Sequence, residues 1–137
     1  MRCAMMEAAQ RYIATGQAAL MAGDWHGARV AYEASLSEQD SPEARDGLGA
    51  ALWWLNDIAR AHEQKTAAYL GYKQDANYRR AALIAAWLAR EQVFLHGNTH
   101  AMNGWFARAA RLLHQAGACP EHGWITLFQA SMQATDE

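Results

Sequence analysis

The chain repeats itself with a period of 33 residues. Comparison of the first segment of the sequence, residues 4–40, with the segment 33 residues later aligns five identical pairs: Gly16 with Gly49, Ala18 with Ala51, Asp24 with Asp57, Ala28 with Ala61, and Ala34 with Ala67. The Ala pairs carry little weight, because 31 of the 137 residues are Ala. The Gly and Asp pairs carry more, since they fall at equivalent points of two segments of helical length. A period of about 20 to 50 residues is typical of stacked helical repeats.

The paired glycines and aspartates have physical roles in such a repeat. Glycine inside a helix costs roughly 1 kcal/mol relative to Ala, and close approach of a neighbouring helix is the usual compensation. We therefore expect Gly16 and Gly49 to lie at helix crossings, against Ala28 and Ala61 respectively. Asp24, like its repeat partner, follows a very short turn and is suited to cap the next helix. Each repeat should then be an antiparallel pair of helices.

Further residues that typically end or cap helices extend this pattern to an all-α fold of about seven helices. No segment alternates apolar and polar residues with period two, so no strand is expected. The expected helices span about 4–22, 25–38, 42–55, from Asp57 to 73, from Asp75 or Asn77 to 96, from Asn98 to 117, and from Pro120 onward. Ser41 should cap the third helix, with Pro42 at its first position. We expect one domain, 1–137, made of units at about 4–40, 41–75 and 76–118 and a partial unit at 119–137.

The motifs of the first two units resemble the tetratricopeptide repeat. The first unit reads Tyr12-x2-Thr15-Gly16-x2-Ala19 and then Ala28-x3-Tyr32, and the second reads Arg45-x2-Leu48-Gly49-x2-Leu52 and then Ala61-x3-Lys65. The second unit departs from the repeat consensus at Arg45 and Lys65, where an aromatic residue is usual. The resemblance implies a right-handed solenoid of antiparallel helix pairs, with the first helix of each pair on the concave face.

Longer sequence segments are similar to the helical-repeat region of bacterial LuxR-type regulators. They are Gly23-Asp24-Trp25 with Ala28-Arg29, the segments 49–55 and 85–89, and the segments 103–109 and 119–124. In such regulators the repeats are a sensory or protein-interaction part, and a separate helix-turn-helix domain binds DNA. We expect this chain to be the repeat module without that domain, and therefore not to bind nucleic acid directly. The net charge of −2 agrees with that expectation.

The repeat register predicts which residues face a protein or peptide partner. The expected concave-face residues come from the first helix of each unit: Gln10, Ile13, Gln17, Asp46, Ala50, Trp53 and Arg90. Trp53 and Trp54 point about 100° apart on a helix, so both cannot make the same core contact. We expect at least Trp53 to line the groove, and Trp25, Trp87, Trp105 and Trp124 to pack between helices.

An alternative function is self-association through the C-terminal end. Ile125 and Met132 lie about 100° round the last helix from the stripe that packs inward, so an incomplete fourth unit would leave them uncovered. A second copy of the chain would then cover them, as a homo-oligomer.

Metal, cofactor and catalytic sites are not expected. His96, His100, Cys119 and His122 could supply four zinc ligands, but the two histidines straddle a turn and the cysteine is single, so they are better explained as solvated residues. No phosphate loop or catalytic triad motif occurs. The longest apolar run, Ala81–Ala89, is nine residues, against about 20 for a membrane span. The expected compartment is the cytoplasm.

Overall fold

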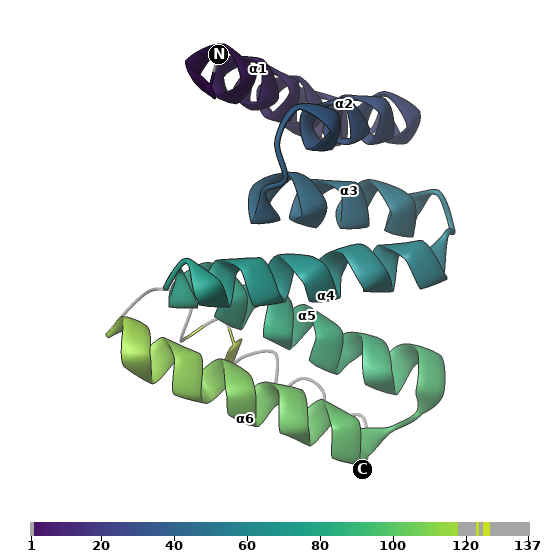
Figure 1. The fold of residues 1–137 in the computed structure, drawn as a ribbon. Helices are drawn as coiled ribbons and strands as arrows, with labels where there is room; N and C mark the ends of the chain where they lie inside the picture. Colours follow the sequence, from purple (N-terminus) through teal and green to yellow (C-terminus); the bar gives the residue numbers. More distant parts are fainter. Residues whose placement is uncertain (1, 118–122, 124, 127–137) are drawn as a thin grey trace. The chain divides into compact units, whose positions relative to one another are not determined.

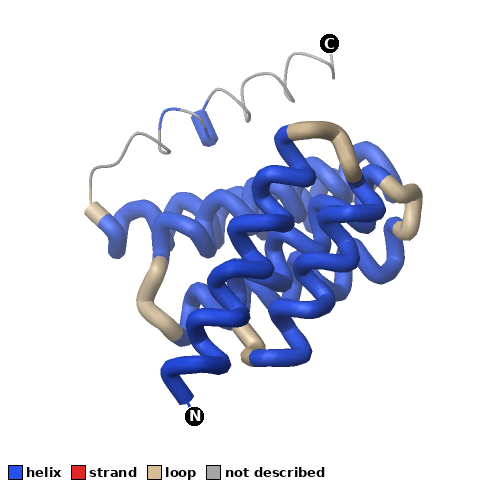
Figure 2. Tube along the Cα trace, turned by 90° about the horizontal axis from the view of Figure 1, so that it is seen from above, coloured by secondary structure: helices blue, strands red, loops and turns tan. Residues whose placement is uncertain are grey.

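The computed structural model of the chain describes residues 2–117, 123, 125 and 126, and these residues form an all-α structure (Figure 1). The helices are α1 (Arg2–Met21), α2 (Trp25–Glu38), α3 (Pro42–Trp54), α4 (Ile58–Gln74), α5 (Tyr78–His96) and α6 (Thr99–Ala116). Short loops join them, and no strand occurs among the residues described (Figure 2). The predicted boundaries of the first six helices are confirmed to within a few residues. The seventh helix predicted from Pro120 lies largely outside the described residues.

Local capping chemistry explains where the helices begin. The Asp24 carboxylate accepts a hydrogen bond from the Gly27 N–H, and the Ser41 hydroxyl accepts one from Ala44 with Pro42 at the start of α3. Asn98 caps α6 in the same way. Of the two candidates for the cap of α5, Asn77 supplies the side chain and Asp75 does not. Each such cap satisfies a backbone N–H that has no partner within its helix.

The turns that close the first two helix pairs have the same hydrogen bonds, displaced by the repeat period. Gly23 and Asn56 both have positive φ, at 76° and 65°. The Asp24 N–H donates to the Ala19 carbonyl over 2.9 Å, and the Asp57 N–H donates to the Leu52 carbonyl over 2.9 Å. In both turns a residue with positive φ is followed by an aspartate, and the chain reverses within two or three residues.

The chain divides after Gly71, within the last turns of α4, into two compact units. This division falls close to the predicted boundary between the second and third repeats. The core of the first unit is a cluster drawn from all four of its helices: Ile13, Ala28, Tyr32, Ala44, Leu48, Ala51, Leu52 and Ala61. In the second unit α5 and α6 pack together, and the side chains buried there include Leu88, Phe106, Leu112 and Leu113.

The two repeat glycines are both buried at helix crossings, and their contacts are also one period apart. A Cβ at Gly16 would lie 2.7 Å from Cζ of Tyr32, and a Cβ at Gly49 would lie 2.9 Å from Cγ of Lys65. Tyr32 and Lys65 are themselves separated by 33 residues. The two helix pairs are therefore structural copies of each other.

The glycine contacts correct one expectation in part. Gly49 does approach its predicted neighbour, since its Cβ would be 3.3 Å from the Ala61 carbonyl oxygen. For Gly16, which was predicted to lie against Ala28, the three nearest atoms all belong to Tyr32, so the tyrosine ring is its nearest neighbour at the crossing. Ala28 is nevertheless fully buried in the same core cluster. The aromatic ring reaches further across the crossing than a methyl group does.

None of the described helices is long and apolar enough to cross a membrane.

Candidate functional site

The predicted partner-binding residues of α1 do not all reach the surface. Gln10 and Gln17 are exposed and lie on one side of the helix. Ile13 is only 5% exposed and belongs to the core cluster of the first unit. Its assignment to a partner-binding face was therefore wrong. Ile13 lies at the edge of the exposed stripe, on the side where Ala9 and Gly16 turn inward, and it is drawn into the core.

The α3 residues Asp46, Ala50 and Trp53 are half-buried. Trp53 packs against the core cluster, so only part of its ring is available to a partner. The neighbouring Trp54 is 60% exposed. Since the two side chains point about 100° apart, one turns toward the core and the other toward solvent. We define the first-helix face as Gln10 and Gln17 of α1 with Asp46, Ala50 and Trp53 of α3.

Asp46 takes part in a polar cluster beneath this face. The Lys65 ammonium of α4 donates to Oδ1 of Asp46 over 2.6 Å, and the lysine side chain is only 9% exposed. Burial, together with the charge of Asp46, raises the pKa of Tyr32 to about 12. The long lysine stem packs against Gly49 while its charged end meets the carboxylate. One oxygen of Asp46 is therefore occupied by a contact within the fold.

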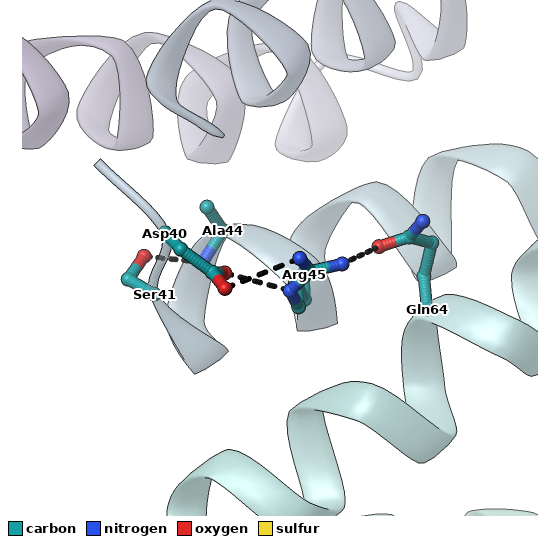
Figure 3. Close-up of polar contacts among 5 residues, drawn as sticks. All are labelled: Asp40, Ser41, Ala44, Arg45 and Gln64. Atoms are coloured by element: carbon teal, nitrogen blue, oxygen red, sulfur yellow. Dashed lines mark hydrogen bonds and ion pairs between the residues drawn. The ribbon is translucent and has the colours of Figure 1, made fainter. Parts of the chain in front are cut away.

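Arg45 is the second polar departure from the repeat consensus, and it bridges three segments (Figure 3). Its Nε and Nη2 donate to the two carboxylate oxygens of Asp40, over 2.7 and 3.2 Å, and its Nη1 donates to Oε1 of Gln64 over 3.1 Å. The hydrogen bond with Asp40 raises the pKa of Arg45 above its ordinary value. This two-pronged pairing ties the loop before α3 to α4.

An aromatic stack of the half-buried Trp25 and the exposed Trp54 lies where α2 begins and α3 ends. The rings of Trp25 and Trp54 are 5.0 Å apart between centroids and 12° from parallel. Trp25 was predicted only to pack between helices, and the pair was not predicted. Trp54 is equivalent in the repeat to Met21, which is 91% exposed at the end of α1. The ends of the first helices thus carry exposed apolar side chains.

In the second unit the predicted residue Arg90 is half-buried on α5. Its guanidinium lies over the ring of Phe94, 5.3 Å from the centroid. On α6, Arg108 lies over Trp105 at 4.5 Å. Both pairs have the spacing at which neighbouring side chains meet on a helix surface, and both are cation–π contacts. Arg90 is thus engaged with its own helix.

The C-terminal residues give one correction. Ile125 is 3% exposed, so the expectation that its side chain lies on an uncovered surface was wrong. Met132, the other residue of the predicted self-association surface, lies outside the described residues, as do Cys119 and His122. His96 and His100 are exposed. Among the residues described, no group of three or more His, Cys, Asp or Glu side chains is placed to hold a metal ion.

A shallow hollow of about 370 Å³ lies in the first unit, at the end of the α1–α2 pair away from its turn. It is lined by Met5 and Met6 of α1 and by Glu38 and Gln39 at the end of α2.

No protein-family profile, curated protein or solved structure matches the chain.

Proposed function

We propose that the chain is a non-catalytic helical-repeat module of the tetratricopeptide type, in which antiparallel helix pairs stack into a right-handed solenoid. The observation that carries the proposal is the pair of repeated crossings, Gly16 with Tyr32 and Gly49 with Lys65. They repeat with the sequence period, as do the turn hydrogen bonds of Asp24 and Asp57. Repeats that reuse one contact at a fixed period stack on one another and present equivalent positions on a shared face.

The proposed activity is binding of a peptide or a partner domain on the first-helix face. Gln17 and Ala50 are equivalent in the repeat and lie on α1 and α3, which contact each other directly. Gln10 adds an exposed amide on α1, and Asp46 adds a carboxylate that is partly open to solvent. Amides and a carboxylate beside the half-buried Trp53 would suit an extended segment that offers backbone N–H groups and apolar side chains.

We extend the proposal to a sensory or interaction role of the kind that repeat regions have in LuxR-type regulators, in the cytoplasm. This part is supported by the sequence phrases around Trp25, Trp54 and Trp105.

The test begins with a selection of peptides from a random library on the full chain. Binding of the selected peptides is then measured for Gln17→Arg and Ala50→Arg, with Val30→Arg as the matched control on the exposed side of α2. We expect the two first-helix variants to weaken binding by about tenfold or more, which equals roughly 1.4 kcal/mol, and the control to bind normally. Peptides that tolerate both variants, or that respond only at Val30, would contradict the proposal.

A further inference from the structure

We propose that the aromatic surface formed by Trp25 and Trp54 binds a cationic side chain, above all an arginine guanidinium, presented by a partner protein. This surface uses other residues than the first-helix face, so the inference goes beyond the proposed function and does not depend on it.

The first observation is an open aromatic ring. Trp54 stacks on Trp25 on one side and is still 60% exposed. Exposed tryptophans are rare among surface residues and are enriched among those that dominate binding energy. The stack also fixes the orientation of the indole, so little side-chain freedom remains to be lost when a partner binds.

The second observation is what this chain does with other aromatic rings. Arg90 covers Phe94, and Arg108 covers Trp105. In the part of the chain that the structure describes, no cation lies over Trp54. The residues three and four positions away on α3 and in the following turn are Ala50, Ala51, Asp57 and Ile58, none of which is basic. Trp54 therefore lacks the guanidinium that the chain itself places over rings of the second unit.

The third observation is the charge around the stack. The two segments that carry it, 21–26 and 54–58, contain the carboxylates of Asp24 and Asp57, and Arg29 and Arg60 lie one turn beyond Trp25 and Asp57 on α2 and α4. Arg60 is shared between Asp57, at 3.7 Å, and Glu33, at 3.6 Å. The carboxylates of Asp24 and Asp57 and the open π face of Trp54 favour the same ligand, a cation. Arginine fits better than lysine, because its planar, weakly hydrated guanidinium stacks on a flat ring.

The test uses the full chain with ¹⁵N-labelled tryptophan indoles and two probe peptides. One is acetyl-Gly-Arg-Gly-Arg-Gly-amide, and the other carries citrulline, which has the same shape without the charge, in place of both arginines. We expect the arginine peptide to shift the indole signal that disappears in Trp54→Leu, with millimolar affinity. A cation–π contact at an exposed site corresponds to roughly two- to fivefold in affinity, so the citrulline peptide should bind several-fold more weakly.

Two sets of variants sharpen the result. Asp24→Asn with Asp57→Asn should weaken the arginine peptide about threefold at low salt and little at high salt, since exposed charges are screened. Asparagine remains a good helix cap, so these variants keep the turn. Phe94→Leu removes a ring that already carries its own guanidinium, and it should leave binding unchanged.

Three results would overturn the inference. Equal binding of the citrulline peptide would show that the surface recognises a flat group and not a charge. Arginine-peptide binding that leaves the Trp54 indole unmoved would place the site elsewhere. Indole shifts that change on dilution of the protein alone would identify a second copy of the chain as the occupant. None of these results bears on Gln17 and Ala50, so binding on the first-helix face is tested separately.

Discussion

The crossing of α2 with α1 and α3 can be tested by adding a single methyl group at Gly47. A Cβ at this position would lie 2.6 Å from Cε2 of Tyr32 and closer still to Cζ. Carbon atoms in good contact are about 3.5–4.0 Å apart. The tyrosine ring would therefore have to withdraw by on the order of 1 Å or more, although its outer atoms also lie against Gly16.

The expected magnitude for Gly47→Ala is the difference of two effects. Replacement of Gly by Ala within a helix stabilises it by roughly 1 kcal/mol. Overpacking of a well-packed core costs about 1–3 kcal/mol, and the size of this overlap favours the upper end. The net loss should be about 2 kcal/mol, or roughly 6–8 °C in Tm for a chain of this size.

In a second background, Tyr32→Leu, the expected effect of Gly47→Ala on stability changes sign. Tyr32→Leu removes the ring atoms that the new methyl group would strike, at its own cost in core packing. In that background Gly47→Ala should stabilise the chain by about 0.5–1 kcal/mol, because only the helix-propensity gain is left. The coupling energy between the two positions should then be about 3 kcal/mol, measured by a double-mutant cycle of chemical denaturation.

The matched control is Gly104→Ala on α6. Gly104, like Gly47, is the sixth residue of its helix, and a Cβ there would meet nothing within 4 Å. This variant should gain about 0.5–1 kcal/mol. If Gly47→Ala proved as stabilising as Gly104→Ala, the close packing of Tyr32 on the α3 backbone would be refuted.

Three further outcomes follow from single residues. Ala76 has a φ of 57°, a conformation that costs a residue with a Cβ about 1–2 kcal/mol; Ala76→Gly should raise Tm by a few degrees, whereas Gly23→Ala should lower it. The pKa of Tyr32 is raised to about 12, so the stability it contributes is complete below pH 10 and is lost as the pH rises toward 12. The difference in unfolding free energy between wild type and Tyr32→Phe should therefore shrink by about 2 kcal/mol over that range, and a constant difference would contradict the assignment. Lys65→Met keeps the apolar stem and should cost less than Asp46→Ala, which removes the carboxylate from a buried ammonium; urea denaturation of both variants gives the order.

The helix boundaries could be predicted from the sequence because their causes are local. Asp24, Ser41 and Asn98 cap helices through hydrogen bonds to residues three positions away, and Pro42 fits only at a helix start. The residues that determine such helix ends lie within four or five consecutive positions of the sequence. The choice between Asp75 and Asn77 was left open, since both side chains can cap. The structure selects the one that follows the left-handed Ala76.

The candidate site was predicted less well, because exposure depends on neighbours that periodicity does not reveal. Gln10, Ile13 and Gln17 share one stripe of α1, but the edge of that stripe turns into the core and takes Ile13 with it. For Trp53 and Trp54, helical periodicity requires only that the two side chains point in different directions. The presence of Trp25 across the crossing decides that Trp54 forms the exposed stack.

The Asp46–Lys65 pair shows how two polar residues can replace two core residues of the repeat. In the first helix pair, repeat-equivalent positions hold Ile13 and Tyr32, and both lie in the core cluster. In the second pair the same positions hold Asp46 and Lys65, joined over 2.6 Å. The lysine stem takes the place of part of the ring against Gly49, and its buried charge requires an anion, which the position equivalent to Ile13 supplies. The two changes make physical sense only together. The same side chain, Asp46, keeps a quarter of its surface in solvent, so the pair that replaces apolar packing also gives the first-helix face its carboxylate.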